Sequence, residues 1–201
     1  PKTYGDGTFV VSATGGASGN PVTFGASGSC TIAGATVTIV SAGNCTITAN
    51  QAAGGAYLAA NPTDLLIPIA KKSLTITSGV TVDTKEYDKT TPATLTFSSP
   101  VLPVLSGVVM GDEADVSVDT ASVYTADFDD SDAGTQSVTV TGIALTGAKA
   151  SNYEVVQPSL TGDITPISLI VTAVPSTKVY DQTDDSFDLP LVTGNLIDPA
   201  V

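Results

Sequence analysis

Alternating apolar and polar residues run along most of the chain, and this period of two constrains its fold more than any other feature. Residues 36–40, 137–141 and 169–172 alternate or form short β-branched runs, and clusters of Gly, Asn, Asp, Ser and Pro bound them. Successive side chains of a strand point to opposite faces, so this is the period of strands. The one candidate helix, residues 50–60, is interrupted by two adjacent glycines. Short strands at this spacing predict an all-β chain of β-sandwiches.

A repeated motif indicates how the chain is organised. The sequence KEYDKTT at residues 85–91 recurs as KVYDQTD at 178–184, and a weaker copy, KTYGDGTF, occupies residues 2–9. A strand that begins with Ser-Leu precedes the second and third copies, at residues 73–77 and 168–172. The tyrosines of successive copies lie 83 and 93 residues apart, a spacing that suits one β-sandwich per repeat.

From these repeats we expect three units, at residues 1–72, 73–167 and 168–201, the last of them an incomplete repeat. The joints near Lys71-Lys72 and Thr165-Pro166 pass almost directly from one strand to the next. Such short connections favour a rod-like array with limited bending over a flexible string of domains. Because the chain begins with a proline rather than a methionine, we expect it to be a piece of a longer or processed polypeptide.

The composition excludes several classes of function. The chain has no His, no Arg and no Trp, and 20 acidic residues against seven lysines give a formal net charge of −13. Histidine bases and arginine fingers are therefore missing, and the negative charge disfavours binding to nucleic acid or to an anionic membrane. No apolar run approaches the roughly 20 residues of a membrane span. We expect no enzymatic activity, no nucleic-acid partner and no membrane insertion.

The two cysteines, Cys30 and Cys45, lie in matching settings, each followed by Thr-Ile. Each shares its strand parity with the Ile two residues later, so both sulfurs face the apolar side. This predicts a structural disulfide in an oxidising compartment; the alternative is two reduced thiols in a cytosolic protein. A plain three-stranded meander would separate the cysteine strands by about 9.6 Å, too far for a disulfide. The middle segment, residues 36–40, should therefore cross to the other sheet, unless the bond forms where strands splay.

Acidic residues concentrate in the unit of residues 73–167, which has thirteen acids and three lysines, whereas residues 1–72 have two acids and three lysines. Eight carboxylates lie within residues 112–132. The densest part of this stretch comprises Asp127, Asp129, Asp130 and Asp132. Oxygen-rich loops can bind calcium weakly, so these four are a candidate calcium site, although their spacing is not that of an EF-hand loop. The alternative is a solvated, self-repelling loop. The sequence predicts no other cofactor.

Several short motifs occur together in the middle unit, and in this combination they resemble the YDG family of bacterial surface repeats. They are KEYD at 85–88, SG at 106–107, GD at 111–112, VTVTG at 138–142, LTG at 145–147, ASNY at 150–153 and DITP at 163–166. The third unit, with KVYD at 178–181 and VTGNL at 192–196, resembles the opening of an MBG domain, a related Ig-like family. The first unit, with PVTF at 21–24, AGNCTITA at 42–49 and Tyr57, resembles bacterial Ig-like repeats.

The resemblance suggests a further candidate, because some Ig-like surface domains contain a Lys–Asn isopeptide bond. Lys85 and Asn152, with Glu86 or Asp88 as the assisting carboxylate, supply those residue types. In the alternative interpretation, Tyr87 packs in the core and Asp88 closes the following turn through an Asx-type hydrogen bond.

These resemblances imply tandem Ig-like β-sandwiches within a large extracellular or surface-attached bacterial protein. We expect a spacer role in an adhesin stalk or cell-surface fibre, with adjacent repeats or neighbouring copies of the chain as partners and no identified ligand. The alternative is a calcium- or carbohydrate-dependent binding module.

The two ends of the chain are unequal, because the first unit lacks the Ser-Leu strand while residues 168–201 contain that strand but stop within a unit. One explanation is that the chain is one register of a longer repeat array. The other is a polymer, in which residues 168–174 of one molecule pair with the open sheet edge of the next through Leu169 and Val171.

Overall fold

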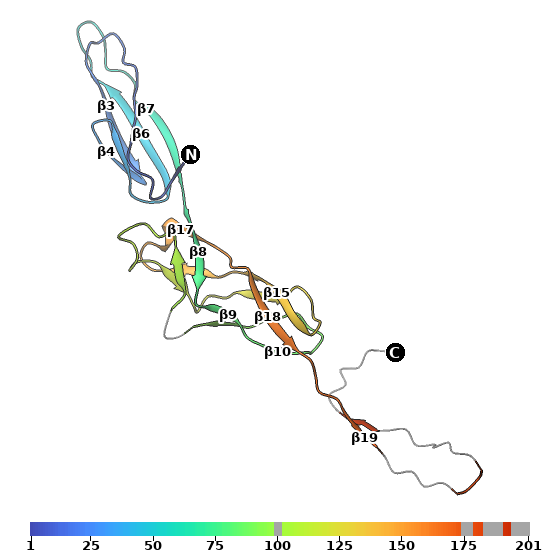
Figure 1. Cartoon of the computed structure of the whole chain (residues 1–201). Coiled ribbons are helices and arrows are strands. Elements are labelled where there is room, and N and C mark those ends of the chain that lie inside the picture. The colour runs from blue at the N-terminus through green and yellow to red at the C-terminus, as the bar shows by residue number, and fades with distance from the viewer. Residues whose placement is uncertain (99–101, 174–178, 183–190, 194–201) are drawn as a thin grey trace. The chain divides into compact units, whose positions relative to one another are not determined.

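The structure is a computed structural model (Figure 1), and it describes residues 1–98, 102–173, 179–182 and 191–193. Within these residues the regular structure is β-strand, apart from one short 3₁₀ helix, η1 (Ala150–Asn152). The predicted all-β fold class is therefore confirmed. No helix in the described ranges has the length and apolar character needed to cross a membrane.

The chain forms two compact units, each built from separate stretches of sequence. Unit 1 comprises Pro1–Val80, Phe97–Val123 and Gly142–Pro158, and unit 2 comprises Thr81–Thr96, Tyr124–Thr141 and Ser159–Val201. Unit 1 therefore contains the whole of the first predicted sandwich together with part of the predicted middle unit. The expected joint at Lys71-Lys72 lies inside unit 1, and the joint at Thr165-Pro166 lies inside unit 2.

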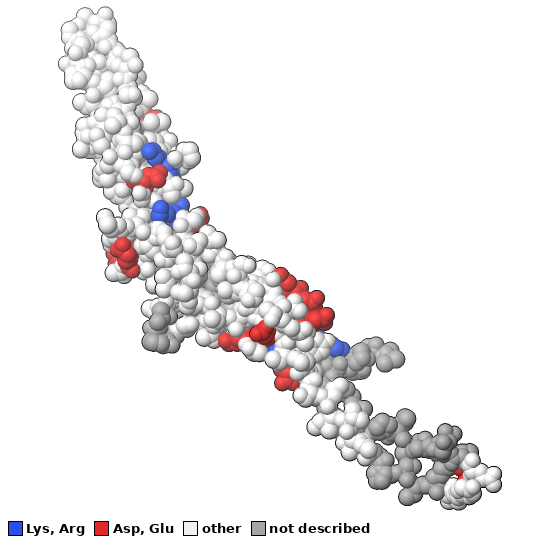
Figure 2. Space-filling model, viewed as in Figure 1, with Lys and Arg blue, Asp and Glu red and all other residues white. Residues whose placement is uncertain are grey.

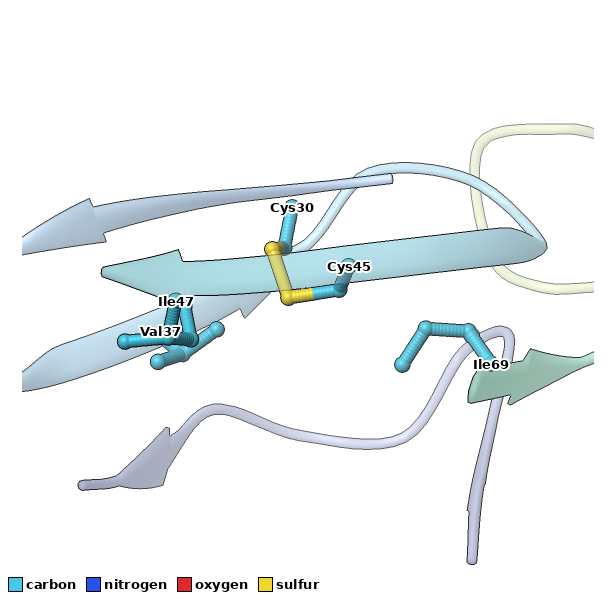
Figure 3. Close-up of a cluster of buried hydrophobic side chains, with 5 residues drawn as sticks. All are labelled: Cys30, Val37, Cys45, Ile47 and Ile69. Carbon is cyan, nitrogen blue, oxygen red and sulfur yellow. A yellow bond between two sulfur atoms is a disulfide. The ribbon is translucent and has the colours of Figure 1, made fainter. Parts of the chain in front are cut away.

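The first sandwich, residues 1–70, has two sheets. One sheet has the order β1 (Lys2–Thr3), β7 (Thr63–Ala70), β6 (Gly43–Gln51) and β3 (Val22–Gly28). The other has the order β2 (Phe9–Val10), β5 (Thr36–Ile39) and β4 (Cys30–Ala33). Between them lies a core of buried side chains shown in Figure 3: Cys30, Val37, Cys45, Ile47 and Ile69. Their alternate positions along β4, β5, β6 and β7 are the apolar positions of the period-two pattern.

The rest of unit 1 is built around β8 (Lys72–Ser78), which starts two residues after β7 ends. This strand pairs antiparallel with β12 (Val104–Ser106) and parallel with β17 (Tyr153–Val156). A second pair, β13 (Ser117–Asp119) and β16 (Ala144–Thr146), is antiparallel. Leu74 of β8 is fully buried, with 0% of its surface exposed.

Unit 2 contains a four-stranded sheet with the order β10 (Lys85–Glu86), β18 (Leu160–Thr165), β15 (Gly134–Thr141) and β14 (Thr125–Phe128). The buried apolar residues of unit 2 are Leu95, Ala126, Phe128, Val138, Val140 and Ile164. Unit 2 also contains an antiparallel pair, β19 (Ile170–Thr172) with β20 (Leu191–Thr193). The strands β9 (Val80–Val82) and β11 (Leu95–Phe97) pair with each other. Each of them contains a point at which the chain changes from one unit to the other.

The four-stranded sheets of the two units have the same topology. In each sheet a two-residue strand pairs parallel with the last long strand, and the remaining two pairings are antiparallel. The two-residue strands are β1 and β10. They begin the first and second copies of the Lys-x-Tyr motif, and the tyrosine of each copy follows its strand directly. The internal repeat inferred from the sequence is thus also a structural repeat of one sheet.

The charged side chains are unevenly distributed in Figure 2. Acidic atoms gather over the region of β15 and β18, while the visible surface of the first sandwich carries few charged groups. This agrees with the concentration of acids in residues 73–167.

Candidate functional site

The predicted disulfide is confirmed. Cys30 and Cys45 are bonded, with their Cα atoms 5.3 Å apart, and both side chains are buried between the sheets (Figure 3). The cysteines lie in different sheets, on β4 and β6, so the exclusion of a plain meander is also confirmed. The segment that changes sheet differs from the one expected: β5 pairs with β4 as a hairpin, and β6 joins the other sheet.

The four aspartates of the candidate calcium site are exposed at the end of the β14–β15 pair. Asp129 Oδ1 accepts a hydrogen bond from Thr139 Oγ1 at 3.0 Å, and Asp130 Oδ1 accepts one from the backbone N–H of Asp132 at 3.0 Å. Among the described residues, no three acidic or cysteine side chains come together in a way that could hold a metal ion. The geometry favours the alternative, a solvated surface loop.

The isopeptide candidates have different partners. Lys85 Nζ donates to the carbonyl of Thr90 at 2.8 Å and forms an ion pair with Asp88 Oδ1 at 2.9 Å. Asn152 Oδ1 instead accepts a hydrogen bond from the backbone N–H of Ala42 at 3.0 Å. Asp88 Oδ1 also accepts the N–H of Thr90 at 2.9 Å, which is the Asx-type turn of the alternative interpretation. Lys85 therefore organises its own turn.

The proposed donor strand is already paired within the chain. Val171 lies opposite Val192 in the β19–β20 pair, and Leu169 and Val171 are 57% and 65% exposed. Lys178 of the third motif copy, and residues 194–196 of the MBG-like segment, lie outside the described residues.

A buried cluster that the sequence did not predict lies in unit 1, where the first sandwich meets the residues around β8 and β17. It consists of Tyr4, Asp112 and Tyr153, and we call it the junction cluster. Tyr4 Oη donates a hydrogen bond to Asp112 Oδ2 at 2.7 Å, and Tyr153 Oη donates to the same oxygen at 2.6 Å. The two rings meet edge to face, with their centroids 5.3 Å apart and their planes at 86°. All three residues are buried.

Local structure places Tyr4 at this junction. Strand β1 runs parallel to the end of β7, and the N–H of Tyr4 donates to the carbonyl of Ala70 at 2.9 Å. The chain then turns at Gly5, whose φ of +88° favours glycine. A Cβ at Gly5 would lie 2.6 Å from Cγ2 of Val109, so this position also needs glycine for packing.

Asp112 and Tyr153 are held by their own backbone contacts. The N–H of Asp112 donates to the carbonyl of Val109 at 3.0 Å, forming a turn at the end of the segment after β12. Tyr153 begins β17, and its hydroxyl oxygen accepts the N–H of Val109 at 3.1 Å. The Tyr153 hydroxyl thus accepts one hydrogen bond and donates another, which satisfies it fully.

Further contacts extend the junction beyond the three polar residues. Leu74 and Val116 are buried beside the tyrosines, and Ile39 and Ala42 of the first sandwich pack against the same group. The hydrogen bond from Ala42 N–H to Asn152 Oδ1 adds a polar link between the first sandwich and η1. Residues of the first sandwich and of the strands that follow it therefore pack in one cluster at the junction.

The electrostatics of the cluster favour fixed protonation states. Burial and the hydrogen bond to Asp112 raise the pKa of Tyr4 to about 12, and the same two causes raise the pKa of Tyr153. The hydrogen bond from Tyr153 lowers the pKa of Asp112, outweighing the opposing effect of burial. At neutral pH the cluster is one carboxylate between two neutral tyrosines, with its charge compensated by strong hydrogen bonds. This arrangement suits a structural joint rather than proton transfer.

Two surface hollows are lined by described residues of unit 1. One of about 350 Å³ is lined by residues that include Lys71, Ser151 and Glu154, and one of about 520 Å³ lies over the loop of residues 11–24. In the second hollow, Gln51 Oε1 accepts the N–H of Gly16, and Gln51 Nε2 donates to the carbonyl of Asn20, both at 2.7 Å. The amide of Gln51 is thereby committed to holding the loop.

Comparison with protein families identifies a YDG domain at residues 70–161. Comparisons with curated proteins and with solved structures find no match. The YDG match starts at the last residue of β7 and includes β8, Asp112 and Tyr153, but Tyr4 precedes it. The junction cluster thus joins the YDG domain to the sandwich before it.

Proposed function

We propose that this chain is a spacer segment of tandem β-sandwich repeats in a large extracellular bacterial protein, such as an adhesin stalk or a cell-surface fibre. The observation that carries the proposal is the junction cluster. A flexible string of domains would have a solvated linker between repeats, whereas here Tyr4 is buried against Asp112 and Tyr153 of the YDG domain. Burial of side chains from both repeats restricts their relative motion.

Two further features support an extracellular setting. The disulfide between Cys30 and Cys45 is of the kind that persists in oxidising compartments. The YDG domain is the part of the chain in which a bacterial surface repeat was expected from its motifs. Adjacent repeats of the same polypeptide are the proposed partners, and the proposal needs no cofactor and no catalytic residue.

A distance measurement across the junction tests the spacer role. Spin labels at Thr38 and Thr146, both exposed and both in unit 1, would be introduced as noncanonical amino acids so that the disulfide is undisturbed. Pulsed electron paramagnetic resonance should give one narrow distribution of the distance between the two labels in the native chain. Asp112→Ala should broaden it, because two buried hydroxyls lose their acceptor. A broad distribution in the native chain would rule out a stiff spacer.

The alternative, a calcium- or carbohydrate-dependent binding module, is tested separately. Thermal melting with and without calcium, at matched ionic strength, should show no specific stabilisation if the chain is a plain spacer. A calcium-dependent rise in Tm that Asp129→Asn and Asp130→Asn abolish would support the binding module instead. Glycan-array binding that survives competition by unrelated acidic proteins would support carbohydrate recognition.

A further inference from the structure

The Lys-x-Tyr motif occupies the same structural position in both copies that the structure describes. In the first copy, Lys2 lies opposite Ile69, and the N–H of Tyr4 donates to the carbonyl of Ala70 at 2.9 Å. In the second copy, Lys85 lies opposite Ile164, and the N–H of Tyr87 donates to the carbonyl of Thr165, also at 2.9 Å. Tyr87 therefore stands at the end of its sheet in the same way as Tyr4.

The two tyrosines differ in what surrounds them. Tyr4 is 7% exposed and hydrogen-bonded to Asp112, whereas Tyr87 is half-buried. The strands that follow also correspond, because β8 and β19 both belong to segments that begin with Ser-Leu. Leu74 of the first is 0% exposed within the core around the junction cluster, whereas Leu169 of the second is 57% exposed. Among the described residues of unit 2, Tyr87 and Leu169 thus correspond to the tyrosine and the leucine of the first junction, and both are more exposed than their counterparts.

We infer that Tyr87 and Leu169 are half of a second junction, which docks the repeat beginning at β19. The partner is a β-sandwich repeat that presents a buried carboxylate to accept the hydrogen bond of Tyr87 Oη. The same repeat places an aromatic ring edge to face with the ring of Tyr87. This inference rests on the proposed function. It follows from the correspondence with the first junction. There the acceptor Asp112 and the aromatic ring of Tyr153 both come from the repeat that follows Tyr4.

The chain supplies the parts for a direct test. In an extended chain, residues 1–167 are followed by a second copy of residues 73–167, so that Ser73-Leu74 replaces Ser168-Leu169. The second copy brings its own Asp112 and Tyr153 to the position where the partner is expected. Tyr87→Phe in the first copy should then raise the equilibrium constant for unfolding by about tenfold or more, the effect of losing a hydrogen bond to a buried carboxylate.

Three controls make the result decisive. Tyr87→Phe in the 201-residue chain should have a much smaller effect, and Tyr57→Phe, at a tyrosine that is 57% exposed, should be nearly neutral in both chains. Asp112→Asn in the second copy alone should cost at least as much as Tyr87→Phe, because Tyr153 of that copy also loses its charged acceptor. The double variant should cost less than the sum of the two single variants, because both remove the same Tyr87 hydrogen bond. The inference is overturned if the second copy stays unfolded, or if it folds and Tyr87→Phe costs the same in both chains. The spin-label measurement concerns only Tyr4, so failure there would instead count against the spacer role.

Discussion

One carboxylate oxygen, Asp112 Oδ2, accepts hydrogen bonds from two buried tyrosines that lie far away from it in sequence. Hydrogen bonds to charged groups contribute about 1.5–3 kcal/mol each. The stability of the junction thus depends on a few polar atoms, so single substitutions of these residues should lower it measurably.

Tyr4→Phe removes one hydroxyl and keeps the ring. We expect it to lower the free energy of unfolding of unit 1 by about 1.5–3 kcal/mol, because Asp112 loses one of its donors while the edge-to-face contact with Tyr153 survives. Denaturant unfolding followed by intrinsic tyrosine fluorescence measures this. Tyr57→Phe is the matched control, since Tyr57 is exposed and outside the cluster. Equal effects of the two substitutions would contradict the assigned role of Tyr4.

The pKa shifts of the cluster predict how its stability depends on pH. Asp112 has a lowered pKa, so its contribution is complete above its ordinary value of about 3.9 and is lost as the pH falls through the folded-state pKa. Tyr4 has a raised pKa of about 12, so its contribution is complete below about pH 10 and is lost as the pH rises toward 12. Thermal melts across this range should show Asp112→Asn flattening the acidic limb. An unchanged acidic limb would show that another group dominates it.

The elements that build the junction are very short, and their geometry matters more than their length. Strand β1 has two residues, and the turn at Gly5 after it brings Tyr4 to Asp112. Gly5→Ala should destabilise unit 1 by about 1–3 kcal/mol, because it introduces both backbone strain and a contact with Val109. Gly7→Ala is the matched control, since a Cβ there meets nothing within 4 Å and its φ is not in the left-handed region. Comparable losses in the two variants, measured by denaturant unfolding, would refute this account of Gly5.

The disulfide joins the two sheets of the first sandwich and closes a loop with a sequence separation of 15. Its removal by Cys30→Ala with Cys45→Ala should cost about 3 kcal/mol, in the chain-entropy account of a loop of this size. Hydrogen exchange should show the loss in β3 to β7 and leave β14, β15 and β18 of unit 2 unaffected. Free alkylation of both thiols in the native, unreduced protein would contradict the bond itself.

At the scale of the whole molecule, the acidic character of residues 73–167 predicts a salt effect. Asp127, Asp129, Asp130 and Asp132 are exposed near one another in sequence and repel one another. Raising the ionic strength with sodium chloride should stabilise unit 2 more than the first sandwich, because screening relieves like-charge repulsion. Hydrogen exchange at low and high salt separates the two responses. An equal response in both regions would show that this repulsion is negligible.

How far the sequence predicted the structure depends on the range of the interactions. Strand parity is local, so it correctly placed Cys30 and Cys45 on the core side and predicted their bond. The Lys-x-Tyr repeat was equally visible, and the structure places its first two copies at corresponding positions of two sheets. The junction cluster was missed because Tyr4 and Asp112 are 108 residues apart, and no local pattern pairs them. The acidic stretch of residues 112–132 predicts solvated carboxylates, and this prediction is wrong for Asp112, which is 8% exposed and accepts two hydrogen bonds.

The parallel pairing of β1 with the end of β7 determines how the first sandwich would respond to tension. Lys2 lies opposite Ile69 and Thr3 opposite Ala70, so the strand that enters this sandwich lies beside the one that leaves it. Opposite forces at Pro1 and Lys71 would slide these strands past each other along their common axis. Their hydrogen bonds would then carry the load together in shear, instead of opening one after another. Since β10 and β18 repeat this parallel pairing, the same geometry recurs in the four-stranded sheet of unit 2.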